Sequence, residues 1–198
     1  AVDDSGENTI IVDSGANRLL VGLDESDAAA IASADVLALQ LEIPLETVLE
    51  AAGLARATGT TVVLNAAPIR DLPAELLASL DVLVVNEHEA AHLAGDREWP
   101  DLTSDVPVVV VTLGARGALL LRRDRDDVSV PAYPVKAVDA TGAGDTFCGA
   151  FAAAVAEGTD LEAALRFAVA AASLSVETPG AVPSIPLRAA IDARLNKK

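Results

Sequence analysis

The chain has 198 residues, of which 52% are hydrophobic, so it can bury one core and is not intrinsically disordered. Its 30 acidic and 14 basic residues give a formal charge of −16, which argues against nucleic acids and anionic membranes as partners. The single cysteine excludes an intramolecular disulfide framework. No apolar run reaches the ~18 residues of a membrane helix, so we expect a soluble, cytoplasmic protein.

Short apolar runs alternate with helical patterns along the chain. The runs predict strands at residues 9–12, 35–41, 60–64, 82–85 and 108–112, then a hairpin from residues 117–121 and 128–130. The helical spacing predicts helices at residues 24–34, 45–57, 73–80, 86–93, 144–157, 161–176 and 186–195. Residues 14–17 are expected to form a loop, and residues 96–105 leave no room for a full helix.

This alternation predicts the fold class. Strands that are apolar throughout favour a mostly parallel, doubly wound sheet with helices on both faces, in a single α/β domain over residues 1–198. In such sheets, ligands bind beyond the carboxyl ends of the strands. We therefore expect the loops that follow the strands to line one crevice.

A glycine-rich turn precedes the long apolar helix in the last third of the chain. Gly142 and Gly144 flank Ala143, so the turn can expose successive backbone N–H groups at a helix N-terminus, which is an anion site. Asp145 falls in the first helical turn and could accept a proton from a hydroxyl that attacks a phosphoryl group. The alternative is an acid that only caps the helix. The glycine spacing fits neither a Walker loop nor a dinucleotide fingerprint.

A second segment carries both histidines of the chain. His88, Glu89 and His92 satisfy the zinc-hydrolase pattern, although a third ligand would have to be a carboxylate from outside the motif. A different interpretation uses Asn86 and Glu89, which share one helical face and could hold waters around Mg²⁺. Asn86 could equally be a helix N-cap.

Two further features are open to structural interpretations. Residues 112–117 form a glycine-rich turn after a strand, which could be a simple hairpin turn. Glu42 follows an apolar strand and stands two residues before Pro44, where it could be a surface acid near a helix start.

Taken together, these segments resemble the ribokinase family, also called the PfkB carbohydrate kinases. Residues 139–147 are similar to the C-terminal signature of the family, and residues 86–89 to its Asn-x-x-Glu motif. Residues 112–117 are similar to its nucleotide loop. The resemblance makes the zinc pattern a coincidence. Similarity to the ribokinase branch in particular is carried by residues 6–8, 15–17, 41–46, 65–68 and 179–184.

The resemblance implies MgATP-dependent phosphorylation of a sugar's primary hydroxyl, with ribose as the expected sugar. Asp145 would be the general base, and the amides of Gly142, Ala143 and Gly144 would stabilise charge on the transferring phosphoryl group. Glu42 would bind the sugar together with Asp145. The nucleotide would contact Asn86, Thr112, Gly114, Ala115, Arg116, Gly117 and Gly144.

The resemblance also implies two metal ions. Glu89 would hold Mg²⁺ through water. A monovalent cation, usually K⁺, would bind beside the anion site, several of its ligands being backbone carbonyls. By position these ligands would be Asp139, Thr141, Ser175, Thr178, Gly180 and Ser184.

The sequence also departs from the family pattern. A complete family member carries, before the residue equivalent to Ala1, the first strands, further sugar-binding motifs and most of a lid that makes a homodimer. Residues 1–15 are expected to be the remnant of that lid and entry strand, and one sheet edge is expected to be open. The alternative function is therefore a non-catalytic remnant that binds nucleotide or a partner. Val169 stands where related ribokinases place a polar residue near adenine.

Overall fold

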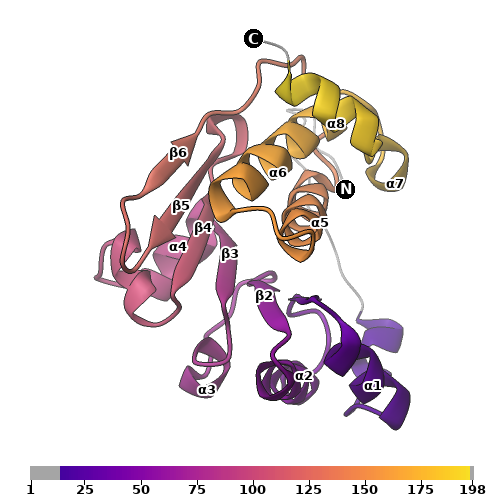
Figure 1. Cartoon of the computed structure of the whole chain (residues 1–198), viewed down its shortest axis with the longest axis vertical. Helices are drawn as coiled ribbons and strands as arrows, with labels where there is room; N and C mark the ends of the chain where they lie inside the picture. Colours follow the sequence, from indigo (N-terminus) through magenta and orange to yellow (C-terminus); the bar gives the residue numbers. More distant parts are fainter. Residues whose placement is uncertain (1–13, 197–198) are drawn as a thin grey trace.

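The computed structural model describes residues 14–196, which form one six-stranded sheet with the strands in chain order (Figure 1). The first four strands are parallel, and the last two return antiparallel as a hairpin. The strands are β1 (Val36–Leu39), β2 (Thr61–Asn65), β3 (Val82–Asn86), β4 (Val108–Thr112), β5 (Ala118–Arg122) and β6 (Val128–Val130).

Helices cover both faces of this sheet, as the sequence predicts. One face packs against α1 (Glu25–Ser33), α2 (Leu45–Thr58), α3 (Ala74–Leu77), α4 (Glu87–Ala94) and the 3₁₀ helix η2 (Trp99–Ser104). The other face packs against α5 (Ala143–Ala156), α6 (Leu161–Ser175) and α8 (Arg188–Leu195). The remaining elements are the 3₁₀ helices η1 (Gly15–Leu19) and η3 (Gly114–Arg116) and the short α7 (Ala181–Ser184).

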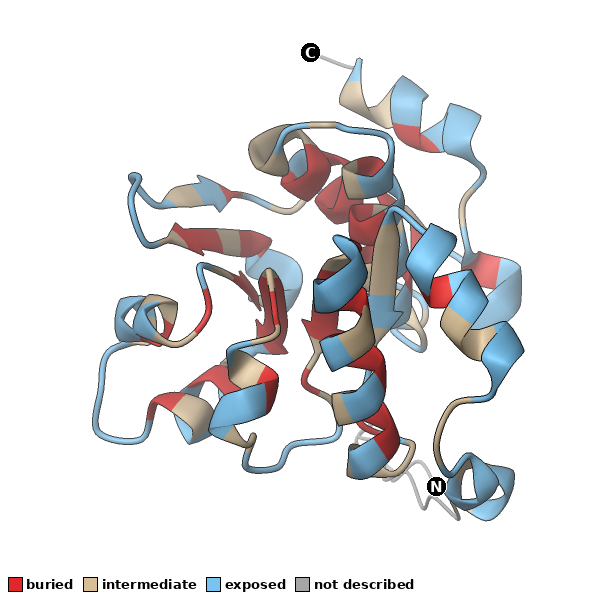
Figure 2. Cartoon of the chain, turned by 60° about the horizontal axis from the view of Figure 1, so that its bottom comes forward, coloured by how far each residue is buried: buried red, intermediate tan, exposed pale blue. Residues whose placement is uncertain are grey.

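Alternation along the strands divides the core into two layers. In β3, Leu83 and Val85 pack on the α2–α4 side, whereas Val82 and Val84 pack on the α5–α6 side. All four are at most 2% exposed, because a parallel strand between two helical layers buries both of its faces. Figure 2 shows this buried centre in red with exposed helix surfaces around it.

The helix signals in the sequence act at the expected residues. Asp24 caps α1 by accepting hydrogen bonds from the backbone N–H groups of Ser26 and Asp27. Gly59 ends α2 in the left-handed conformation, with φ of 84°. The chain can therefore turn directly from α2 into β2.

Two local predictions are wrong. Residues 15–17, expected in a loop, belong to the 3₁₀ helix η1, which Ser14 precedes as its N-cap. The helix expected at residues 73–80 is only the four-residue α3. The sequence pattern also gave no sign of α7, because four residues are too few to show a helical period. The strand predicted at residues 9–12 and most of the predicted lid remnant lie outside the described residues. None of the helices within residues 14–196 is long and apolar enough to cross a membrane.

Candidate active site

The N-terminus of α5 is built around a left-handed glycine. Gly142 has φ of 75°, and a Cβ on it would lie 3.1 Å from Cβ of Ala181 in α7, so only glycine fits this turn without strain. The Ala143 N–H donates to the Ala140 carbonyl (3.2 Å), whereas the Gly144 N–H has no partner among residues 14–196. The exposed Asp145 follows directly in the first turn of the helix.

A strap of residues 138–141 precedes this turn and is fixed to the end of α6. The two oxygens of the Asp139 carboxylate accept the backbone N–H groups of Thr141 (2.9 Å) and Gly180 (2.8 Å). Hydrogen bonds from the Thr141 side chain and then from these amides lower the pKa of Asp139 to about 2. The Val176 carbonyl accepts the N–H groups of Val138 and Asp139.

Hydrogen bonds connect several of the predicted monovalent-cation residues near the end of α6. Asp139 bridges Thr141 and Gly180, and the Thr178 N–H donates to the Ser175 carbonyl (3.2 Å). The buried hydroxyls of Ser175 and Ser184 donate to carbonyls of their own helices, at 2.9 Å and 2.7 Å. Five of the six predicted ligands are thus joined to another of the six by a hydrogen bond, and Ser184 is the exception.

A cavity of about 560 Å³ lies between the N-terminus of α5, the carboxyl end of β4 and one side of α6. Six of the residues that the sequence analysis assigned to nucleotide or phosphate binding line it: Thr112, Gly114, Ala115, Gly117, Ala143 and Gly144. Val169, which the resemblance places near adenine, lies on the opposite wall. The rest of that wall was not predicted from the sequence and includes Tyr133, Pro134, Val135, Ala137, Ala172, Ser173 and Val176. These side chains are mostly apolar and give no local sequence signal.

The glycine turn after β4 is packed tightly against the hairpin. A Cβ on Gly117 would lie 2.0 Å from the Val130 carbonyl oxygen. The neighbouring Arg116 does not line the cavity, because its guanidinium donates to Glu87 at the start of α4. The structure thus connects the predicted nucleotide loop with the predicted Mg²⁺ motif through an ion pair.

Asn86 and Glu89 form a reciprocal capping box at the start of α4. The Asn86 N–H donates to Oε2 of Glu89 (2.7 Å), and the Glu89 N–H donates to Oδ1 of Asn86 (2.9 Å). Burial raises the pKa of Glu89, partly opposed by the Asn86 N–H. Burial and the charges of Asp145 and Glu89 raise the pKa of Cys148 to about 12, so both carboxylates lie near this thiol.

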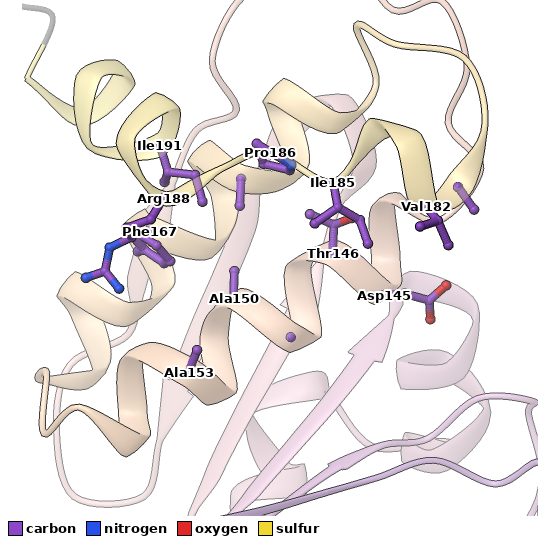
Figure 3. A pocket seen from close by; sticks show the side chains of 14 residues that line it. Asp145, Thr146, Ala150, Ala153, Phe167, Val182, Ile185, Pro186, Arg188 and Ile191 are labelled. Atoms are coloured by element: carbon purple, nitrogen blue, oxygen red, sulfur yellow. The ribbon is translucent and has the colours of Figure 1, made fainter.

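A second cavity, of about 430 Å³, is an apolar groove between α5, α6, α7 and α8 (Figure 3). Asp145 lies at one end and Arg188 at the other. Thr146 also lines it, and its buried Oγ1 has no hydrogen-bond partner among residues 14–196. The α5 N-terminus therefore separates two cavities, with Gly144 facing the first and Asp145 facing the groove.

Glu42 and the zinc pattern lie apart from these cavities. Glu42 is exposed after β1 and donates its N–H to the Gln40 side chain (2.5 Å), and it lines neither cavity. In the zinc pattern, Glu89 is committed to the cap, and Nε2 of His92 lies 2.9 Å from Oδ1 of Asp71. No cluster of three His, Cys, Asp or Glu suited to a metal occurs within the described part of the chain.

The fold and site define an α/β protein with the geometry of an anion site at a helix N-terminus, at the carboxyl edge of its sheet and beside a carboxylate. A family model described as pfkB family carbohydrate kinase matches residues 1–188. The chain belongs to this family.

The most similar proteins include several ribokinases. The chain is 39% identical to ribokinase of Staphylococcus aureus, in a match that covers 94% of this chain and 65% of that protein. It is 39% identical to a bifunctional ribokinase/ribose-5-phosphate isomerase A of Fructilactobacillus sanfranciscensis, covering 96% of this chain and 37% of that protein. The chain therefore spans less than two thirds of the length of each of these two relatives.

Solved structures agree with the observed fold. The structure of Arabidopsis thaliana ribokinase complexed with ribose and ATP superposes with a TM-score of 0.92 at 34% identity. The match covers 100% of this chain and 68% of that one. Ribokinase from Thermotoga maritima gives a TM-score of 0.86 at 37% identity, covering 99% and 68%.

Proposed function

We propose that this chain carries the phosphoryl-transfer part of an ATP-dependent sugar kinase whose acceptor is ribose. The observation that carries the proposal is the position of the α5 N-terminus between two cavities, with Gly144 on one and Asp145 on the other. A donor and an acceptor on opposite sides of one anion site can meet at the transferring phosphoryl group.

The residues of the chain suit the roles that this reaction requires. The acceptor hydroxyl oxygen forms a bond to the γ-phosphorus, the bond from that phosphorus to the bridging oxygen breaks, and ADP leaves. The Asp145 carboxylate takes the hydroxyl proton. The Gly144 N–H and the positive end of α5 stabilise the charge on the phosphoryl oxygens, and Gly142 keeps the turn open toward them.

The Mg²⁺ proposal rests on the donor set at the start of α4. Oε2 of Glu89 is engaged by the Asn86 N–H, and the other carboxylate oxygen remains to hold a metal-bound water. Glu89 and Asp145 lie near the same thiol, so the metal would be close to the reacting groups. When bound, Mg²⁺ would neutralise charge on the ATP phosphates.

The K⁺ proposal rests on the strap and the turn after α6. Carboxylate, carbonyl and hydroxyl oxygens gather there, and the lowered pKa of Asp139 keeps its carboxylate ionised at neutral pH. A hard monovalent cation would bind such oxygens. Its residues would be Asp139, Thr141, Ser175, Thr178, Gly180 and Ser184.

The relatives support the choice of substrates. The Arabidopsis thaliana ribokinase structure holds ribose and ATP, and its fold matches this whole chain. We extend both ligands to this chain, with Glu42 as a further sugar contact. We also propose a cytoplasmic location, where ATP is supplied, and a homodimer for a protein of the relatives' full length.

The test is ADP formation by the purified chain with MgATP, KCl and ribose, compared with Asp145→Asn. We expect ribose-dependent turnover that Asp145→Asn lowers by about 10²–10⁴-fold while MgADP affinity is retained. Glu162→Gln is the matched control, because Glu162 is a half-buried first-turn acid of α6 that lines neither cavity, and it should leave turnover unchanged. Equal turnover of Asp145→Asn and the parent would overturn the base assignment. Nucleotide binding without turnover on any sugar would favour a binding module instead.

A further inference from the structure

The far end of the first cavity has the chemistry of a nonspecific aromatic-base site. Starting from the anion end at Gly144, the opposite wall is formed by Pro134 and Val135 of one loop and by Val169, Ala172 and Val176 along α6. None of the side chains that line the cavity is charged. With phosphates at the α5 N-terminus, the base of a nucleotide would lie against this apolar wall.

The polar side chains of the cavity are the hydroxyls of Thr112, Tyr133 and Ser173. The Thr112 hydroxyl lies at the β4 end and donates to the Val85 carbonyl (3.4 Å). Oγ of Ser173 accepts the Tyr133 N–H (3.3 Å). The guanidinium of Arg194 lies over the Tyr133 ring, with Cζ 5.8 Å from the ring centroid. The lining contains no amide, carboxylate, imidazole or cationic side chain that could read the edge of a base through paired hydrogen bonds.

Adenine and guanine differ in their hydrogen-bonding groups and little in their stacking surface. A site rejects the wrong base strongly only when its own buried donors and acceptors would be left unpaired. A wall of aliphatic side chains has no such groups. We propose that this cavity binds purine nucleotides by burial and stacking and does not select adenine over guanine. This proposal rests on the proposed function, because it needs the nucleotide in this cavity.

The experiment is calorimetric titration of the purified chain with MgADP, MgGDP and pyrophosphate. We expect the dissociation constants of MgADP and MgGDP to agree within about tenfold, and pyrophosphate to compete with both. A preference of more than about a hundredfold for MgADP, from reading of the base by loop backbone, would overturn the inference and leave the proposed function intact. Binding of neither nucleotide would overturn both.

Variants of the wall test whether the base lies there. Ala172→Ser adds a hydroxyl at a half-buried position, and Val169→Asn adds an amide at a buried one. We expect at least one of them to change the MgADP:MgGDP affinity ratio by about fivefold or more, whereas Val169→Ile should keep the ratio of the parent. Circular dichroism confirms that each variant is folded. An unchanged ratio in folded Ala172→Ser and Val169→Asn would place the base elsewhere and overturn the inference.

Discussion

A pair of glycine-to-alanine substitutions separates the structural role of the α5 turn from its binding role. Gly142 has φ of 75°, and its added Cβ would lie 3.1 Å from Cβ and 3.2 Å from Cα of Ala181. The left-handed backbone costs a non-glycine residue about 1–2 kcal/mol, and the close contact adds about 1–2 kcal/mol. We therefore expect Gly142→Ala to lower the free energy of unfolding by about 2–4 kcal/mol, or Tm by roughly 5–10 °C.

Gly144 is the matched partner for this test. Its φ is ordinary for a helix, and a Cβ on it meets no atom within 4 Å, so Gly144→Ala should keep or raise stability by up to ~1 kcal/mol. The same Cβ lines the first cavity where phosphate must approach the backbone, so MgADP affinity should fall about tenfold or more.

Urea unfolding followed by circular dichroism measures the stability, and calorimetry measures MgADP binding. Two results would refute the reasoning. A Gly142→Ala protein as stable as the parent would show that the turn is not constrained as described. Parent-like MgADP affinity in Gly144→Ala would show that phosphate does not approach this backbone.

Three other substitutions test the surrounding structure. Gly117→Ala puts a Cβ 2.0 Å from the Val130 carbonyl oxygen, so it should lower the free energy of unfolding by about 3 kcal/mol or more in urea melts. The control is Gly53→Ala, whose added Cβ meets no atom within 4 Å and should not lower that free energy. Asp139 has a folded-state pKa of about 2, below its unfolded value, so its ionised form stabilises the fold above about pH 4. The stability difference between the parent and Asp139→Asn should be full at pH 7 and vanish as the pH falls from about 4 to 2; a constant difference would contradict the hydrogen bonds described. Glu89→Gln keeps an acceptor for the Asn86 N–H and removes a charge that burial disfavours, so stability at pH 7 should not fall. The Mg²⁺ concentration needed for nucleotide binding should rise about tenfold, and an unchanged requirement would refute the metal role of Glu89.

Much of the fold was predictable because its signals are local. The four valines at residues 108–111 predict a buried strand. Asp24, Asn86 and Gly59 mark helix ends by their capping chemistry. The parallel pairing of the first four strands follows from short strands that alternate with helices. By contrast, α7 escaped prediction because its four residues include Pro183 and show no period.

The candidate site divides in the same way. The glycine turn at residues 142–144 can be predicted from the sequence, because two closely spaced glycines directly before a helical pattern are typical of an anion site at a helix N-terminus. The wall residues Ala172 and Val176 are not visible, because only tertiary packing distinguishes a cavity-lining aliphatic side chain from a core one. The pairing of Arg116 with Glu87 likewise joins residues 29 positions apart, which no local pattern reveals.

The central claim is that nucleotide phosphates bind at the N-terminus of α5. Amide NMR of the ¹⁵N-labelled chain titrated with MgADP measures this directly. We predict the largest shift changes at Gly142, Gly144, Gly114 and Gly117, with smaller changes at Val169 and Ala172 along the cavity wall. Saturable changes confined to other parts of the chain, or none at millimolar MgADP, would contradict the claim.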